Sequence, residues 1–273
     1  MQRIEINTSP GFHAIDNTDW LKTVAIILVT IDHFGYFFIE DNQWWSLTGR
    51  LAAPVFFFLL GYAETRKVPF SWIWTGVILT VLDSWNTNWA WVAPNILLSL
   101  ALIRLARTNV QFLLRRHGWP SYLLLTAVLI AAVPITTEFV EYGSEGWLWA
   151  LFGLGQRMYI DSRAVTAQST PSPATKPNPG LMRLLAGLVA SVVCVWQEQL
   201  EYSFSETQLA VLILGISGLS ISLCQFRRGP SRIQLPQLFA GGLHFIGRHT
   251  LEIYAIQLAG FEIIINMLPD LAL

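Results

Sequence analysis

The chain has 273 residues, of which 53% are hydrophobic and only 13% are charged, and its mean hydropathy is +0.47. A soluble domain carries roughly 25% charged residues, so this composition excludes an ordinary soluble protein. The formal net charge of -1 gives no reason to expect nucleic acid as a partner. Because the apolar runs are continuous rather than alternating, they favour an all-α, polytopic transmembrane helix bundle over a β-barrel.

We predict about nine membrane spans, within a range of eight to ten, and an N-terminus in the cytoplasm. The predicted spans are 20–39, 46–62, 70–83, 89–106, 119–136, 146–160, 181–197, 208–225 and 249–268. With this count, every lysine and arginine except Arg50 lies on the cytoplasmic side. Basic residues prefer that side, and one missed span would invert every later loop, so the distribution supports the count.

Four segments follow from this topology. They are a cytoplasmic N-terminal segment (1–19), an N-terminal transmembrane half that holds the candidate active site (20–160), a flexible cytoplasmic loop (161–180) and a C-terminal transmembrane part (181–273). The loop is rich in Ser, Thr and Pro, which is typical of a linker. Cys194 and Cys224 lie near opposite membrane faces and should not pair, and no Cys/His cluster indicates a metal site.

The stretch VTIDHFGYFF, residues 29–38, places Asp32 and His33 inside the first span. Ionisable side chains are costly in hydrocarbon and usually mark function there, although polar contacts between helices are the alternative. Lys22 precedes His33 by eleven residues, about 20° past three full helical turns, so both share one stripe about 16 Å long.

Arg50 opens the second span at a depth similar to that of Asp32. The loop between these spans is short, so the helices should be antiparallel neighbours. We predict that Arg50 pairs with Asp32 and orients His33, because a guanidinium binds a carboxylate with two hydrogen bonds and keeps its charge. Extension of the Arg50 side chain to the membrane interface is the competing interpretation.

The ninth span begins with FIGRHTLEIYAIQL, residues 245–258. Arg248 and His249 lie at its cytoplasmic boundary, and Glu252 lies one turn inside. Cations at a helix start can hold phosphates or lipid headgroups. Taken singly, Lys22, Arg248 and His249 are explained more simply as the positive charges typical of cytoplasmic loops.

These stretches resemble a known family. LKTVAIILVTIDHFGYFF and LTGRLAAPVFFFLLGYAETRK are similar to the N-terminal half of the TraX family, EYGSEGWLWALFGLG to its middle and FIGRHTLEIYAIQL to its C-terminal helix. The family includes the bacterial conjugal pilin acetylase and is similar to the membrane acyltransferases of the acyltransferase type 3 family. In those enzymes an arginine precedes the histidine of the first span by eleven residues, where this chain has Lys22. They often carry a histidine near the end of the last block, where this chain has Gln257.

The resemblance implies an acyltransferase of the bacterial cytoplasmic (inner) membrane that moves an acetyl group from cytoplasmic acetyl-CoA to an amine or hydroxyl on the far side. His33 would be the general base, a role that suits an imidazole with an ordinary pKa near ~6.5. Asp32 and Arg50 fall on motif positions, and Arg50 is also a candidate to stabilise the reacting carbonyl. Acetyl-CoA carries phosphates, so a cationic entrance is expected, for which Lys22, Arg248 and His249 are available. The acceptor, a pilin-like peptide or a glycan, is not defined by any motif, and no metal is expected.

Two other functions stay open. A proton-coupled transporter or channel could use Asp32, His33 and Glu252 as a proton relay, although no internal repeat supports it. A non-enzymatic membrane assembly factor would tolerate replacement of His33 without loss of function.

Overall fold

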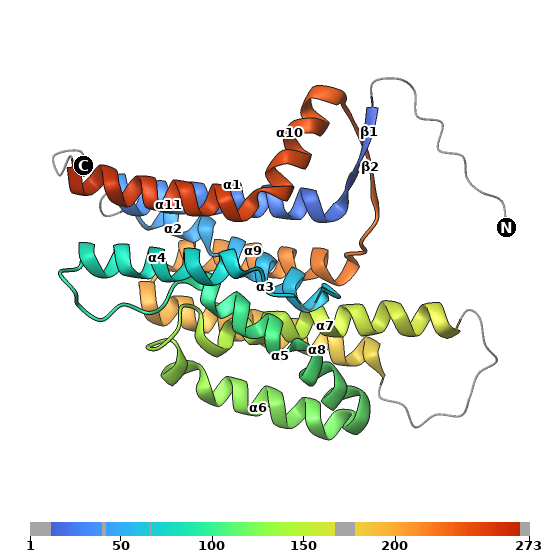
Figure 1. Cartoon of the computed structure of the whole chain (residues 1–273). Helices are drawn as coiled ribbons and strands as arrows, with labels where there is room; N and C mark the ends of the chain where they lie inside the picture. Colours follow the sequence, from blue (N-terminus) through green and yellow to red (C-terminus); the bar gives the residue numbers. More distant parts are fainter. Residues whose placement is uncertain (1–11, 40–41, 66, 167–177, 268–273) are drawn as a thin grey trace.

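The computed structural model describes residues 12–39, 42–65, 67–166 and 178–267, and it shows a bundle of helices that run roughly along one direction (Figure 1). The elements in chain order are β1 (Phe12–Asp16), α1 (Asn17–Phe38), α2 (Gln43–Gly49), α3 (Ala52–Tyr62), α4 (Phe70–Asn86), α5 (Ile96–His117), α6 (Trp119–Thr136), α7 (Gly143–Thr166), α8 (Pro179–Tyr202), α9 (Glu206–Gln225), β2 (Pro230–Pro236), α10 (Gln237–Arg248) and α11 (Thr250–Met267).

Six of the described helices are long and apolar enough to cross a membrane, namely α1, α5, α6, α8, α9 and α11. Their outward faces carry large apolar side chains such as Leu105, Leu124, Leu188 and Leu214, which are between 60% and 72% exposed. Soluble surfaces rarely display apolar side chains over so wide an area, whereas lipid accommodates them. The chain is therefore a multi-pass membrane protein. The count of nine spans and the cytoplasmic N-terminus stay predictions.

The predicted span 46–62 is divided into two helices. α2 ends at Gly49 and α3 begins at Ala52. Pro54 explains the interruption, because a proline has no N–H for the carbonyl four residues earlier and its ring collides with that carbonyl, which here belongs to Arg50. The interruption places Arg50 at a helix junction inside the bundle, where its side chain is only 12% exposed.

The centre of the bundle is the contact between α3 and α7. Phe57, Phe58 and Phe152 are completely buried at this contact. Gly61 lets the helices approach closely, since a Cβ at this position would overlap the backbone carbonyl of Ala150. This packed centre holds α3 in place, and α1 lies along its outer side.

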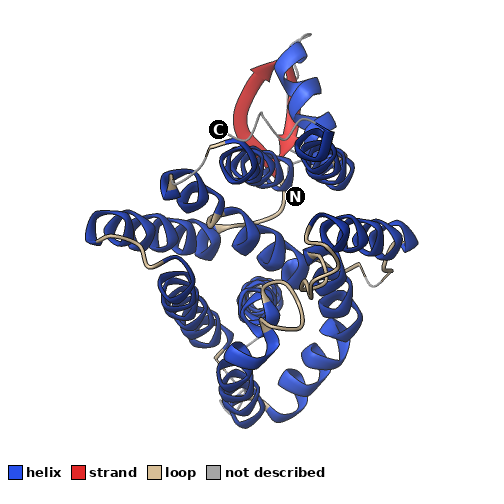
Figure 2. Ribbon diagram, turned by 90° about the vertical axis from the view of Figure 1, so that its left-hand side faces the viewer, coloured by secondary structure: helices blue, strands red, loops and turns tan. Residues whose placement is uncertain are grey.

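The two-stranded sheet and α10 were not predicted. β1 and β2 are antiparallel, with Phe12 opposite Pro236 and Asp16 opposite Pro230. Figure 2 shows the sheet and α10 together at one edge of the bundle. Both strands are short and lack a regular alternation of apolar and polar residues, so their sequences indicate loops. The pairing joins the predicted N-terminal segment 1–19 to the connection that precedes the last two helices.

Several boundaries differ from those predicted. α5 begins only at Ile96, because Asn95 caps its N-terminus and residues 87–95 form a connection. α7 and α8 both extend into the predicted loop 161–180, of which 167–177 lie outside the described residues.

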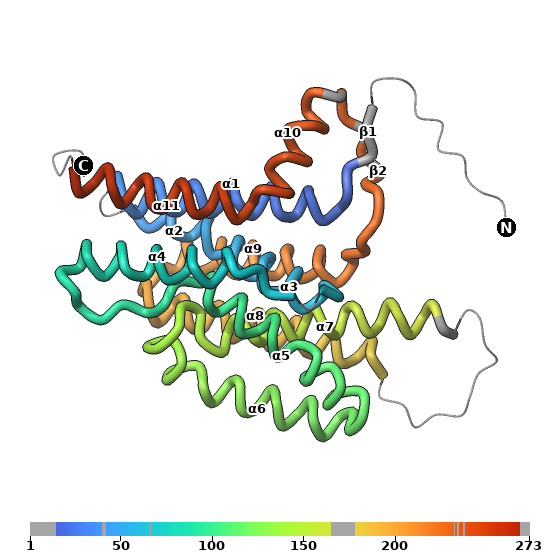
Figure 3. Tube along the Cα trace, in the orientation of Figure 1, coloured from blue at the N-terminus to red at the C-terminus, as the bar shows by residue number. Residues whose placement is uncertain are grey.

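α11 lies beside α1 and runs in the same direction, so the first and last helices of the described chain are neighbours (Figure 3). This contact brings side chains of the last helix next to those of the first predicted span. Cys194 and Cys224 are both free, which confirms that they do not pair.

Candidate functional site

A cavity of ≈ 570 Å³ lies between α1, α3, α4, α5 and α11. This volume is within the usual range for small-molecule sites. Lys22, Asp32 and His33 all line it. The stripe predicted on the first span therefore follows the wall of a cavity that joins Lys22 to His33, about 16 Å along α1.

The part of the cavity nearest the sheet, called the entrance below, is basic. Its cations come from five segments and are Lys22, Arg104, Arg157, Arg228 and Arg248, together with two acidic side chains, Glu64 and Glu252. Lys22 Nζ donates a hydrogen bond to the carbonyl oxygen of Gly247, at 3.3 Å. Arg104 Nε donates to the carbonyl oxygen of Thr65, at 3.3 Å, and its guanidinium lies 4.8 Å from the ring centre of Trp72.

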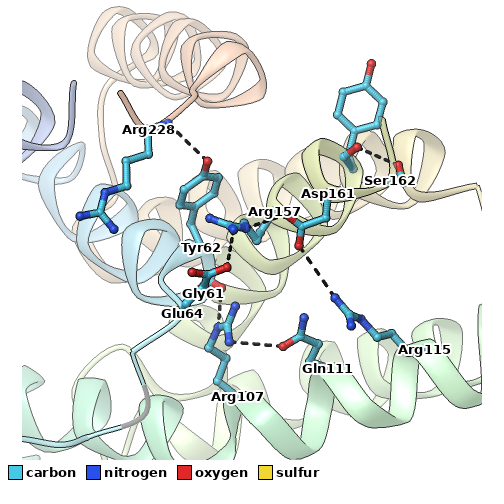
Figure 4. Close-up of polar contacts among 11 residues, drawn as sticks. Gly61, Tyr62, Glu64, Arg107, Gln111, Arg115, Arg157, Asp161, Ser162 and Arg228 are labelled. Atoms are coloured by element: carbon cyan, nitrogen blue, oxygen red, sulfur yellow. Dashed lines mark hydrogen bonds and ion pairs between the residues drawn. The ribbon is translucent and has the colours of Figure 1, made fainter. Parts of the chain in front are cut away.

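An ionic network fixes one side of this entrance (Figure 4). Arg157 binds Glu64, and its Nε lies 2.9 Å from Asp161 Oδ1, while Arg115 Nη2 lies 3.8 Å from Asp161 Oδ2. Arg107 Nε donates to the carbonyl oxygen at the end of α3, at 2.9 Å. The network therefore neutralises much of the charge of Arg157 and ties α3, α5 and α7 together.

Three cations of the entrance have no carboxylate within ion-pair distance among the described residues, namely Lys22, Arg104 and Arg248. Arg228 instead has Asp16 Oδ2 3.6 Å from its Nε. The entrance thus keeps uncompensated positive charge, which suits an anionic group such as a phosphate.

Arg50 joins two buried carboxylates at the opposite half of α1. Its Nη2 lies 3.5 Å from Asp32 Oδ1, and its Nε lies 3.6 Å from Glu198 Oε2. Nε also donates to the carbonyl oxygen of Ser46, at 3.2 Å, and the guanidinium lies 4.6 Å from the ring centre of Tyr202. The predicted contact between Arg50 and Asp32 is thus present. Arg50 does not line the cavity, whereas its partner Asp32 does.

Glu198 and Tyr202 were missed by the sequence analysis. The sequence analysis gave Glu198 no role, and nothing in its local sequence indicates contact with Arg50. Its side chain is 4% exposed, so it is deeply buried at the helix junction. A buried carboxylate requires a charged or hydrogen-bonding partner. Applied to Glu198 on α8, this rule is the signal that could have indicated contact with Arg50.

His33 faces α11 and the cavity rather than Asp32. Its Nδ1 lies 3.4 Å from Gln257 Nε2, and its ring centre lies 5.7 Å from that of Tyr254. Tyr254 lines the cavity, and its hydroxyl oxygen accepts a hydrogen bond from Asn95 Nδ2, at 3.0 Å. Tyr254 and Gln257 are three residues apart on α11, a spacing that places both on one helix face. The sequence analysis assigned neither of them a contact with His33.

The structure places only some of the residues predicted to bind CoA at the cavity. Lys22 and Arg248 line the cavity, whereas His249 does not. The His249 ring packs against Phe245, with ring centres 4.6 Å apart, and its Nδ1 lies 3.8 Å from Glu252 Oε1. His249 therefore lies beside the entrance, and the binding roles of all three residues stay predictions.

Comparison with known proteins identifies the family. The model of the TraX family, described as "TraX protein", matches residues 17–214. "Protein TraX" of Escherichia coli is 27% identical over 156 residues, which are 55% of this chain and 58% of that protein. An uncharacterised protein of Rickettsia prowazekii, RP591, is 37% identical over 84 residues, which are 31% of this chain and 34% of that protein. The aligned regions thus span little more than half of the curated relatives at most, and no solved structure matches the chain significantly. Because the family model covers most of the sequence, including α1 to α8, the chain belongs to the TraX family.

Proposed function

We propose that this protein is an integral-membrane acyltransferase that moves an acetyl group from acetyl-CoA to an amine or hydroxyl acceptor. The observation that supports this most strongly is the single cavity that joins a basic entrance to His33. A donor with a phosphorylated head and a long thioester arm fits that arrangement of charge.

The donor binds with its phosphates at the entrance. Lys22, Arg104 and Arg248 provide charge there that no carboxylate among the described residues neutralises. The pantetheine arm then follows α1 over about 16 Å and brings the thioester beside His33. Under the predicted topology this entrance faces the cytoplasm, where acetyl-CoA is made.

His33 acts as the general base. The acceptor nitrogen or oxygen attacks the thioester carbonyl carbon while His33 takes its proton, and a new C–N or C–O bond forms. The C–S bond then breaks, and the CoA thiolate receives that proton from the imidazolium. The products are the acetylated acceptor and CoA, and His33 returns to its neutral state.

Tyr254 is placed to stabilise the negative charge that develops on the carbonyl oxygen. Arg50 was a candidate for this role, but it does not line the cavity, whereas Tyr254 does. Asn95 Oδ1 accepts from the backbone N–H of Leu97, so the Nδ2 atom of Asn95 is the one that donates to the Tyr254 oxygen. The hydroxyl hydrogen of Tyr254 is then available for the substrate. One such donor contributes roughly 10²- to 10³-fold to a rate.

The acceptor approaches from the membrane face opposite the entrance. A pilin-like peptide or a glycan is proposed, and the relatives in Escherichia coli and Rickettsia prowazekii favour a bacterial cytoplasmic (inner) membrane as the location.

The test is incubation of the detergent-purified protein with radiolabelled acetyl-CoA, for wild type and for His33→Ala. Release of CoA together with label in protein or membrane extract, lost in His33→Ala, is the expected result. A folded protein that neither binds nor consumes acetyl-CoA would refute the proposal and favour a proton-coupled transporter.

A further inference from the structure

A general base needs one ring nitrogen without a hydrogen. A neutral imidazole carries a single hydrogen, on either Nδ1 or Nε2, and the partner of one nitrogen decides the state of the other. The partner of His33 Nδ1 is the side-chain amide of Gln257 on α11. The orientation of that amide therefore determines whether His33 can accept a proton from its cavity side.

The Gln257 amide lies between two groups of α1. In the structure, Gln257 Oε1 contacts Thr30 Oγ1, and Gln257 Nε2 lies 3.4 Å from His33 Nδ1. The oxygen and nitrogen of a glutamine amide have nearly the same shape, so the surrounding hydrogen bonds decide which end faces which neighbour.

Thr30 resolves the orientation. Its hydroxyl carries one hydrogen, and its Oγ1 lies 2.7 Å from the carbonyl oxygen of Ile26, one helical turn earlier. With the amide in this orientation, the hydroxyl can also donate to Gln257 Oε1. Both neighbouring oxygen atoms can only accept, and one hydrogen cannot serve both contacts. With the amide turned, Thr30 donates to Ile26 and accepts from Gln257 Nε2, so both contacts contain a hydrogen.

We infer that Gln257 donates through Nε2 to Thr30 and accepts through Oε1 from the Nδ1–H of His33. Gln257 is thus a positioning residue that keeps the hydrogen on Nδ1 and leaves Nε2 as the base. When His33 becomes an imidazolium, the same Oε1 still accepts from Nδ1–H, so the ring does not turn between the two proton transfers. This role rests on the proposed function.

Kinetics of two Gln257 variants test the role. Gln257→Leu has a similar volume and no acceptor, whereas Gln257→Glu keeps an acceptor for Nδ1–H, and Thr30 can turn its hydrogen to the new carboxylate. We expect kcat to fall about 10- to 100-fold in Gln257→Leu, with KM for acetyl-CoA unchanged. Gln257→Glu should stay within a few-fold of wild type. Gln225→Leu, at the end of α9 and outside the cavity lining, is the matched control and should equal wild type.

A spectroscopic measurement separates this inference from the proposed function, because it needs no substrate. The chain has 5 histidines, so ¹⁵N NMR of histidine-labelled protein is tractable, and the signal lost in His33→Ala identifies His33. We expect the Nδ1–H tautomer in wild type and a shift toward Nε2–H in Gln257→Leu. An Nε2–H tautomer in wild type, or a Gln257→Glu variant as impaired as Gln257→Leu, would overturn the inference. Absence of His33-dependent turnover would instead overturn the proposed function alone, and the tautomer would still be measured. If Gln257→Leu does not fold, the wild-type spectrum and Gln257→Glu still decide.

Discussion

The contact between α1 and α2 at Gly49 gives the sharpest mutational prediction. A Cβ at Gly49 would overlap the Cβ and Cγ of Asp32, so Gly49→Ala must displace the Asp32 carboxylate from Arg50. Overpacking of this kind costs about 1–3 kcal/mol. Alanine is the better helix former by about 1 kcal/mol, which leaves a net cost of up to about 2 kcal/mol. For a chain of this size we expect the apparent Tm in detergent to fall by up to about 6 °C.

The same substitution should lower catalysis more than stability. Asp32 adjoins His33 in sequence, so a shift of this helical turn moves the imidazole, and a displacement of about 1 Å can cost ~10²-fold in rate. The matched control is Gly218→Ala on α9, where an added Cβ meets nothing within 4 Å. The assay is kcat for acetyl-CoA turnover together with the apparent Tm. If Gly49→Ala and Gly218→Ala give equal values of both, the placement of Asp32 against Gly49 has no functional role.

Three further substitutions test other parts of the site. Arg50→Lys should lower kcat at least ten-fold, because one ammonium cannot join both buried carboxylates as the guanidinium does; full activity would refute this. Tyr254→Phe should lower kcat about 10²- to 10³-fold with KM unchanged, whereas Tyr122→Phe, which removes a buried hydroxyl elsewhere, should not; equal effects would contradict a donor role for Tyr254. Lys22→Gln should raise KM for acetyl-CoA about ten-fold, equivalent to about 1.4 kcal/mol, with kcat little changed; a loss confined to kcat would place Lys22 outside the phosphate site.

The positive charge of the entrance predicts that acetyl-CoA binding depends on salt concentration. Because Arg157 and Arg228 are already engaged by Glu64, Asp161 and Asp16, the net attraction for an anion comes mainly from the remaining cations. Binding of acetyl-CoA should therefore weaken as salt concentration rises, since exposed charges are screened over about 10 Å at 0.1 M salt.

The sequence by itself determined the class of protein and the content of α1. Composition and long apolar runs are sufficient for a helical membrane protein, because lipid leaves few other solutions for the backbone. The common stripe of Lys22 and His33 follows from helix geometry within one segment. The pairing of Arg50 with Asp32 could also be predicted, since a short connection makes consecutive helices neighbours.

Only the tertiary structure decided what stands around His33. Tyr254 and Gln257 come from the last helix, and Glu198 reaches Arg50 from α8, far along the chain from either partner. The choice of neighbouring helices, and the rotation of each about its axis, depend on how all their surfaces pack together. No local pattern carries that information, so the sequence located the imidazole, and the fold supplied the residues that surround it.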